Sequence, residues 1–350
     1  MQIPTFLKEL LHKQYGEEQT ARIEEGFAAR RPVTLRANPL RSSKQQVEQA
    51  LSMAGIGYRQ VPWYDDALII EQARESEIAA LEVYAGGGVY MQSLSSMLPP
   101  LVLQPGKGDA VLDMAAAPGG KTTQMAALTG NGAGITACEK NKIRADRLRY
   151  NLDRQGARSV LVMQTDARQL DELFRFDKVL LDAPCSGSGT LQTWRDQLRF
   201  EPTLVERSVK SQRALLAKAL KVLKVGGEMV YSTCSILQQE NEDIVKEVLK
   251  PGKVELIPID AEAFGDLPLL PTTLPGTVCI CPDPLFEGFF VAKLRRVNRA
   301  ESSMSAASSI ALSGSGESPS NSSWSGGESR LDNHNNSAKN SGPNSFRSCN

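Results

Sequence analysis

The sequence predicts an α/β fold in which a mostly parallel sheet carries helices on both faces, with a small α+β unit before it. Three features predict this fold. Between Gly87 and Arg296, short apolar runs alternate with helix-like segments, as in parallel sheets covered by helices. The first 86 residues show a shorter mixture of helical and strand patterns. From about Asn298 onward the chain is rich in Ser, Gly and Asn and nearly free of large apolar residues.

These features divide the chain into three parts, with expected boundaries at residues 1–86, 87–297 and 298–350. The last part can bury too little apolar surface to offset the entropy of ordering, so we expect it to be disordered and assign it no role. In the first part the pattern predicts a helix over 3–29, a strand over 31–40, a helix over 42–55, and strands over 58–63 and 67–70.

The second part supplies the elements of the main sheet in chain order. Each expected strand is a short apolar run, and each expected helix has its apolar residues at helical spacing. The strands cover residues 110–115, 134–139, 159–166, 177–184, 228–234, 278–282 and 288–296. The helices cover residues 119–130, 142–156, 204–227 and 238–250, and the second and third of them end at a glycine cap.

Composition excludes several classes of protein. Lys+Arg and Asp+Glu are both 40, so the charge balance does not indicate a nucleic-acid partner, although a local basic patch remains possible. No apolar run approaches the ~20 residues that span a membrane, and the N-terminus lacks the apolar core of a secretory signal. The six cysteines lack the spacing of a disulfide framework, and the two histidines disfavour a Ser-His-Asp hydrolase or a metal site. We expect a cytoplasmic monomer without a bound metal.

Reactive side chains gather where the expected strands end. Because the carboxyl ends of parallel strands share one edge of a sheet, where ligands bind, these side chains should lie close together. Cys234 has two interpretations: a small hydrophobe that fills the core, or a thiol held at a strand end for chemistry. The side chains in question are those of Asp113, Glu139, Asp166, Asp182, Cys185 and Cys234.

The stretch AAAPGGKTT after Asp113 also has two interpretations. A phosphate-binding loop requires G-x-x-x-x-G-K-[ST], but the position of its first glycine is Ala115. Alternatively, a glycine-rich turn brings the backbone close to an adenosyl cofactor, and small residues clear the space for it. In that interpretation Glu139, at the end of the next strand, accepts hydrogen bonds from the ribose hydroxyls. A plain tight turn would explain the glycines but not the acidic strand ends.

A basic cluster surrounds one strand and loop of the first part. It is either a solvated rim or a surface that binds phosphate groups, and the sequence alone leaves both interpretations open. Its members are Arg30, Arg31, Arg36, Arg41 and Lys44.

Three motifs occur in order: DMAAAPGGKT from Asp113, DAPCSGSGT from Asp182 and YSTCS from Tyr231. With them the chain resembles the Nop/Sun (Fmu-type, RsmB/RsmF-like) family of RNA cytosine-5 methyltransferases over roughly Gly87 to Arg296. YMQSLSSMLPP and, more loosely, RANPLR match as well. The resemblance implies a Rossmann-like class I methyltransferase domain, S-adenosylmethionine as cofactor, and a small N-terminal module similar to an RNA-recognition fold. Because the aromatic stacking signature of that fold is lacking, we expect the basic cluster to make the RNA contacts.

The resemblance also implies roles for the residues at the strand ends. Cys234 matches the nucleophile, and Cys185 matches the second thiol, which is needed for product release. Asp182 matches an acid that bonds to the target cytosine and stays close to the methionine part of the cofactor. Glu139 matches the ribose-binding acid, and Asp166 a residue near the adenine amino group. The expected cofactor-binding residues are Ala115, Ala116, Ala117, Pro118, Gly119, Gly120, Lys121, Glu139, Asp166 and Asp182.

The chemistry of cytosine explains why two thiols are useful. C5 is a poor nucleophile, but addition of a thiolate to C6 makes C5 electron-rich, and a base must remove the C5 proton after methylation. An ordinary thiol has a pKa of ~8.5, so the nucleophile needs a positive setting, for which Lys121 is the candidate. We interpret Cys138, Cys279 and Cys281 as core or strand residues.

We expect ribosomal RNA as the substrate, by resemblance to compact bacterial members of the family, with transfer RNA as the alternative. Two other functions remain open from the sequence. A P-loop-like NTPase is disfavoured by Ala115. A non-catalytic RNA-binding factor would not need both thiols.

Overall fold

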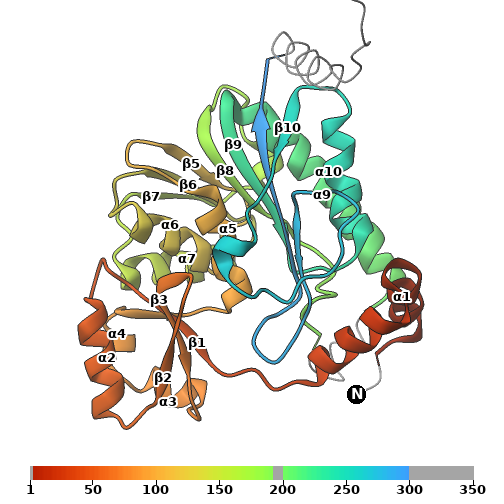
Figure 1. The fold of residues 1–350 in the computed structure, drawn as a ribbon. Helices are drawn as coiled ribbons and strands as arrows, with labels where there is room; N and C mark the ends of the chain where they lie inside the picture. The colour runs from red at the N-terminus through yellow and green to blue at the C-terminus, as the bar shows by residue number, and fades with distance from the viewer. Residues whose placement is uncertain (1–2, 192–199, 299–350) are drawn as a thin grey trace, which may run out of the picture. The chain divides into compact units, whose positions relative to one another are not determined.

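The main sheet has eight strands in this computed structural model, which describes residues 3–191 and 200–298 (Figure 1). They are β5 (Ala110–Asp113), β6 (Gly134–Cys138), β7 (Val160–Met163), β8 (Phe176–Asp182), β9 (Leu223–Thr233), β10 (Val254–Ile257), β11 (Val278–Ile280) and β12 (Phe289–Arg296). Their order is β10-β12-β9-β8-β5-β6-β7, with β11 paired to β12. The strands from β9 to β7 are parallel, and β12 runs antiparallel to its neighbours. The predicted α/β fold with a mostly parallel sheet is confirmed. The predicted tail lies outside the described residues, except for its first residue.

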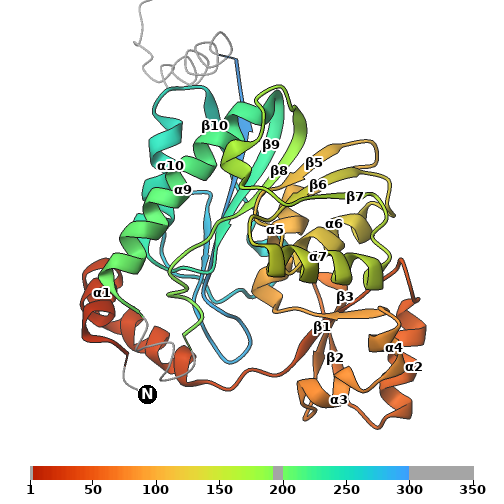
Figure 2. The same cartoon turned by 180° about the vertical axis from the view of Figure 1, so that it is seen from behind.

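Helices cover both faces of this sheet (Figures 1 and 2). One face packs against α5 (Leu94–Leu103), α6 (Gly120–Leu128) and α7 (Lys142–Gln155), and the other against α9 (Pro202–Val222) and α10 (Glu242–Leu249). Successive side chains of a strand point to opposite faces of the sheet, so the sheet separates two hydrophobic cores. Leu180 of β8 packs in the core on the first face, and Val179 and Leu181 pack in the core on the second. No helix in the described ranges combines the length and apolar character needed to cross a membrane.

Two details of the main domain differ from the prediction. Strand β10 at the sheet edge was not predicted. The helix expected over 204–227 ends at Val222, with Leu223 in extended conformation rather than a glycine cap. Gly226 and Gly227 lie within the range of β9, and Gly226 has a φ of 79°. The glycines therefore bend the chain within the strand range instead of closing the helix.

The small N-terminal sheet is antiparallel and has the order β2-β3-β1-β4. Helix α2 begins with a capping box at Ser43, in which the serine side chain accepts from the Gln46 backbone N–H and the Gln46 side chain accepts from the Ser43 N–H. The last strand, β4, follows residue 86, so the small sheet extends past the expected boundary. The elements are β1 (Thr34–Ala37), α2 (Lys44–Met53), β2 (Tyr58–Val61), β3 (Tyr64–Ile70), α3 (Glu75–Ala79), α4 (Glu82–Ala85) and β4 (Val89–Met91).

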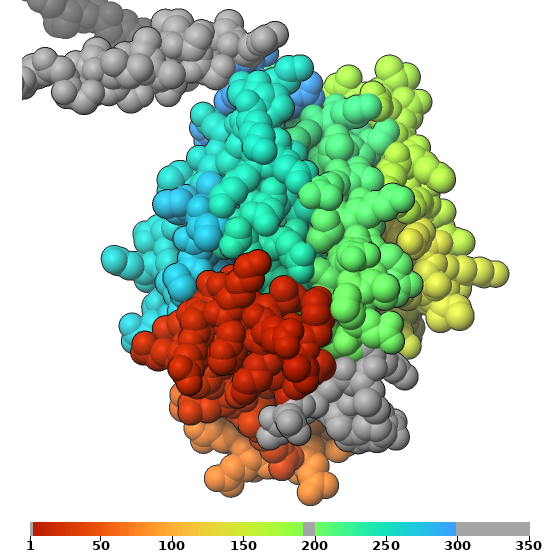
Figure 3. All heavy atoms as spheres, turned by 90° about the vertical axis from the view of Figure 1, so that its right-hand side faces the viewer, coloured from red at the N-terminus to blue at the C-terminus, as the bar shows by residue number. Residues whose placement is uncertain are grey.

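Helix α1 (Thr5–Ala28) packs on the main domain, not on the small sheet with which it was grouped. In Figure 3 it lies, in red, against the green and teal part of the chain. Its buried residues Leu7 and Leu11 join the core that contains α9 and α10. Tyr15 Oη donates to the carbonyl of Ile236 at 2.7 Å, and Gln14 Nε2 donates to the same oxygen at 3.0 Å. The helix therefore contacts the chain just after the predicted nucleophile.

The buried position of Arg36 contradicts the prediction that this member of the basic cluster binds RNA. Its strand, β1, lies between β3 and β4, and the side chain is completely buried. The guanidinium donates from Nε to Gln92 Oε1 at 3.3 Å and from Nη2 to Thr123 Oγ1 at 3.0 Å. Burial lowers its pKa. The prediction that Arg36 contacts RNA is wrong, because this arginine joins the small sheet to α6 and does not reach the surface.

Arg41 is exposed, but its donors are also used inside the protein. It donates to the carbonyl oxygens of Asp153 (2.6 Å) and Arg154 (3.1 Å) in the last turn of α7, where a positive charge is favourable. Arg31 donates to two backbone carbonyls in the same way. The basic cluster is therefore at least partly a set of contacts between segments of the chain, with Arg30 exposed and Lys44 half-buried beside it.

We predict that Arg41→Ala lowers the free energy of unfolding by about 1 kcal/mol, because it removes a charge and two hydrogen bonds from the end of α7. The matched control is Arg30→Ala, for which we expect a change within about 0.5 kcal/mol, as for most surface substitutions. Urea titration of both variants measures the difference. Equal effects would show that the contact of Arg41 with α7 contributes nothing.

Candidate active site

The carboxyl ends of the five parallel strands bring the predicted reactive residues to one edge of the main sheet. In the spatial order of the strands from β7 to β9, the residues at or just after the ends are Asp166, Glu139, Asp113, Asp182 and Cys234. Cys185 follows β8 by three residues. The sequence predicted this gathering, since parallel strands end on one side.

The loop between β5 and α6 is held by its glycines and by Asp113. A Cβ at Gly119 would lie 3.0 Å from Leu148, and Gly119 has a φ of 110°, so this position needs glycine. Asp113 is buried; its Oδ2 accepts from Thr122 Oγ1 at 2.7 Å, which ties the strand end to the first turn of α6. Burial raises the pKa of Asp113 to about 6. Asp113 therefore supports the loop, and it also contributes to the lining of a cavity beside it.

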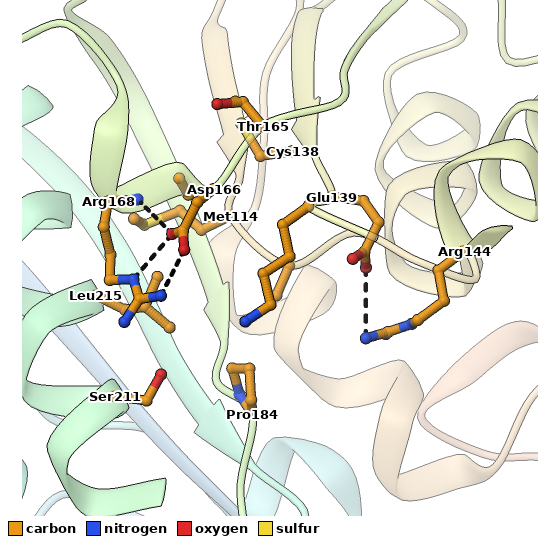
Figure 4. A pocket seen from close by; sticks show the side chains of 13 residues that line it. Met114, Cys138, Glu139, Arg144, Thr165, Asp166, Arg168, Pro184, Ser211 and Leu215 are labelled. Atoms are coloured by element: carbon orange, nitrogen blue, oxygen red, sulfur yellow. Dashed lines mark hydrogen bonds and ion pairs between the residues drawn. The ribbon is translucent and has the colours of Figure 1, made fainter. Parts of the chain in front are cut away.

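Two cavities lie beside this loop, and Ala115 lines both of them. The first is lined by the end of β6, by the segments that follow β6 and β7, and by α9, including Glu139, Asp166 and Leu215 (Figure 4). The second is lined by the loop itself, by residues just before and at the start of α5, and by the end of β8. Its lining includes Gln92, Ser96, Ala115, Ala116, Ala117, Pro118, Gly120, Lys121 and Asp182. Asp166 thus lines the first cavity, and Lys121 and Asp182 line the second.

The two carboxylates of the first cavity have different partners. Glu139 is buried, and its Oε1 accepts from the Asn141 backbone N–H at 2.8 Å, while Oε2 lies 3.4 Å from Arg144 Nη1. Asp166 forms a two-pronged ion pair with Arg168, as Figure 4 shows, and these hydrogen bonds lower the pKa of Asp166. Neither arginine was predicted, and nothing in the motif spacing singled them out.

Lys121 and Asp182 form an ion pair in the second cavity, with 2.7 Å between Nζ and Oδ2. Lys121 also donates to Ser96 Oγ at 2.8 Å, and Ser232 Oγ donates to Asp182 Oδ1 at 2.8 Å. The ring of Phe289 lies 5.4 Å from the ammonium group. Lys121 therefore forms its ion pair with Asp182. The sequence had suggested instead that its positive charge stabilises the thiolate of the nucleophile. Ser232 belongs to YSTCS and could have been found there.

The two thiols lie next to each other, with 3.0 Å between Cys185 Sγ and Cys234 Sγ. The loops that carry them are joined by a hydrogen bond from the Gly189 N–H to the carbonyl of Cys234 at 3.0 Å. The contact with Cys234, burial and the nearby charge of Glu240 raise the pKa of Cys185. Two thiols so close do not both ionise readily, so the pair holds one thiolate and one S–H donor more easily than two thiolates.

The other described cysteines have a different environment. Cys138, Cys279 and Cys281 are buried in the core, and burial raises the pKa of Cys138 to about 12 and that of Cys281 to about 11. This fits their interpretation as core residues. Cys185 and Cys234 are only half-buried, which favours the interpretation of Cys234 as a reactive thiol over that of a core hydrophobe.

Comparisons with protein families and known proteins give a consistent picture. Residues 100–295 match the family model described as 16S rRNA methyltransferase RsmB/F. Residues 3–77 match that of a Methyltr_RsmF/B-like, ferredoxin-like domain.

Among curated proteins, ribosomal RNA small subunit methyltransferase F of Shewanella piezotolerans is 35% identical over 287 residues, which is 77% of this chain and 58% of the relative. A tRNA (cytosine(72)-C(5))-methyltransferase of Pyrococcus horikoshii is 38% identical over 227 residues, covering 63% of this chain and 55% of the relative. The chain thus spans somewhat more than half the length of these relatives. Among solved structures, a methyltransferase homologue from Pyrococcus horikoshii aligns with a TM-score of 0.70 at 33% identity, covering 84% of this chain and all of the other.

Proposed function

Because the chain belongs to the RsmB/F family of 16S rRNA methyltransferases, we propose that it transfers a methyl group from S-adenosylmethionine to C5 of a cytosine in RNA. The observation that supports this most strongly is the pair of half-buried thiols, 3.0 Å apart, beside the strand edge where the cavities lie. A nucleophile and a base are both needed at this carbon, and no histidine lies in this part of the sequence to serve as the base.

The residues of the two cavities fit an adenosyl cofactor. Glu139 sits at the end of the second parallel strand and can accept hydrogen bonds from ribose hydroxyls, and we assign Asp166, which lines the same cavity, to the neighbourhood of the adenine. Ala115, Ala116 and Ala117 leave room beside the backbone of the loop. The cofactor, when bound there, supplies an electrophilic methyl group.

In the proposed mechanism Cys234 acts first. Its thiolate forms a bond to C6 of the cytosine, and the electron pair of the C5–C6 double bond forms the bond from C5 to the methyl carbon. The bond between that carbon and the cofactor sulfur would break, with S-adenosylhomocysteine as the leaving group. Cys185 holds its proton at this stage, because the neighbouring sulfur raises its pKa. Asp182, oriented by Lys121 and Ser232, is placed to accept a hydrogen bond from the cytosine amino group or a protonated N3.

Cys185 acts second, after methyl transfer. Once the sulfur of Cys234 is bonded to carbon, it carries no negative charge, and one cause of the raised pKa of Cys185 is removed. Cys185, which is partly exposed, can then give its proton to solvent water and, as a thiolate, take the proton from C5. The electron pair of the C5–H bond restores the C5–C6 double bond, and the thiolate of Cys234 leaves.

Ribosomal RNA is the substrate we favour, since the family and the Shewanella relative are named for it. Transfer RNA is the alternative, because the Pyrococcus relative carries that name. Incubation with labelled S-adenosylmethionine and either total ribosomal RNA or total transfer RNA distinguishes them. Label in ribosomal RNA alone supports our choice, and label in transfer RNA alone overturns it.

We predict that Glu139→Gln weakens binding of S-adenosylhomocysteine by about tenfold or more, because a charged acceptor of the ribose hydroxyls is replaced by a neutral one. The control is Asp146→Asn on α7, which removes an exposed carboxylate and should leave the affinity unchanged. Isothermal calorimetry measures both. Unchanged affinity in Glu139→Gln would count against the ribose assignment.

A further inference from the structure

A buried carboxylate joins the two loops that carry the thiols. Glu240 is completely buried at the end of the short 3₁₀ helix Gln238–Glu240. Its Oε1 accepts from the Ser186 backbone N–H at 2.8 Å, and its Oε2 accepts from Ser186 Oγ at 2.5 Å and from Ser235 Oγ at 2.6 Å. Ser186 directly follows Cys185, and Ser235 directly follows Cys234. One side chain therefore bonds to the residue after each thiol.

Other contacts hold Glu240 in place. Gln212 Nε2 of α9 donates to Oε1 at 3.2 Å, and Tyr231 Oη of β9 donates to the backbone carbonyl of Glu240 at 2.6 Å. A second link between the loops runs beside it, since Ser188 Oγ and Ser235 Oγ are 2.7 Å apart. Glu240 is thus held by a helix through its carboxylate and by a strand through its backbone carbonyl, and it can impose its position on both loops.

We propose that Glu240 is a positioning residue that keeps Cys185 within reach of Cys234, so that the second thiol can act on the adduct formed by the first. The proposal rests on the proposed function, because product release is the step that needs the second thiol close. The residue itself contacts neither cytosine nor cofactor in this role.

The chemistry of the carboxylate supports a role beyond packing. Glu240 is one of the causes that raise the pKa of Cys185, after the contact with Cys234 and burial. An apolar side chain could fill the same space without that effect. An apolar side chain could not accept hydrogen bonds from the two loops. The carboxylate can accept from both at once, because each of its oxygens has two acceptor positions.

The first test measures the separation of the thiols without any RNA. Diamide removes two electrons and two protons from a pair of close thiols and joins them in a disulfide. We measure the rate at which full-length protein forms the Cys185–Cys234 disulfide, identified by peptide mass spectrometry. We expect Glu240→Ala to slow this rate about 10- to 100-fold, the size of effect that a displacement of about 1 Å can have.

Three variants accompany Glu240→Ala. Glu240→Gln keeps one acceptor oxygen and an amide that can donate to the serine hydroxyls, so we expect a rate within about threefold of the wild type. Ser235→Ala removes the bond to the loop of Cys234 but keeps the Glu240 carboxylate, which still accepts from Ser186 and Gln212, and it should slow the reaction even if Glu240→Ala fails to fold. Gln239→Ala changes the exposed neighbour and should have no effect.

The second test uses RNA and S-adenosylmethionine. If Cys185 is displaced, Glu240→Ala should accumulate a covalent RNA–protein adduct while its affinity for S-adenosylhomocysteine stays within about twofold, because no cofactor contact is changed. Slower disulfide formation in both Glu240→Ala and Ser235→Ala, with rescue by Glu240→Gln, supports the proposal. Wild-type rates in Glu240→Ala, or in Ser235→Ala where the former does not fold, overturn it. If wild-type protein methylates no RNA, the proposed function fails, and the diamide rates still decide whether Glu240 sets the distance between the thiols.

Discussion

Replacing Cys234 with alanine is expected to abolish methyl transfer, with a loss on the order of 10⁴-fold or more, as when other enzymes lose a covalent nucleophile. No covalent complex with RNA should form, because the bond to C6 is never made. Cys185→Ala should behave differently. It should still add to cytosine and transfer the methyl group, and it should then stall as an RNA–protein adduct that survives denaturing gel electrophoresis.

Because the two thiols act one after the other, a variant that lacks both serves as the control. The double variant Cys185→Ala/Cys234→Ala should resemble Cys234→Ala, because nothing is trapped when nothing has been attached. An adduct that accumulates in Cys234→Ala but not in Cys185→Ala would reverse the two assignments. Full activity in both single variants would make both cysteines packing residues.

The second large effect is expected at the ion pair between Lys121 and Asp182. Lys121→Met leaves the half-buried Asp182 without its cation, and we expect the methylation rate to fall about 100-fold as the carboxylate loses its orientation. The free energy of unfolding should fall by about 2 kcal/mol, because one partner of the pair is removed while the other charge stays. Lys142→Met, at an exposed position on α7, is the matched control and should change neither quantity.

A double variant separates stability from catalysis at this pair. Lys121→Met/Asp182→Asn removes both charges, so it should regain most of the lost stability. It should remain inactive, because the acceptor for cytosine is gone as well. Urea titration and single-turnover methylation give the two measurements. Recovery of activity in the double variant would show that Asp182 has no direct role.

The main sheet and the gathering of its strand ends could be predicted from the sequence because both follow from local patterns. Apolar runs define the strands, and parallel pairing places Glu139, Asp182 and Cys234 on one edge regardless of further detail. The identity of the loop before α6 could also be predicted, since its glycines and alanines are consecutive.

Features that depend on distant partners could not be predicted. Periodicity shows that α1 has a buried face, but not that Tyr15 would reach Ile236, which is 221 positions away. A charged residue beside a strand normally indicates exposure, and only the neighbouring Gln92 and Thr123 make Arg36 a buried contact. Glu240 gave no signal, because its partners come from two loops and a helix that meet only in the folded chain.

The most direct test of the central claim is the chemical identity of the product. Ribosomal RNA is incubated with S-adenosylmethionine and either wild-type protein or Cys234→Ala, digested to nucleosides, and analysed by mass spectrometry against authentic standards. We predict 5-methylcytidine with the wild-type protein and none above background with Cys234→Ala. A methylated nucleoside other than 5-methylcytidine, or equal 5-methylcytidine from both proteins, would contradict methylation at C5 through Cys234.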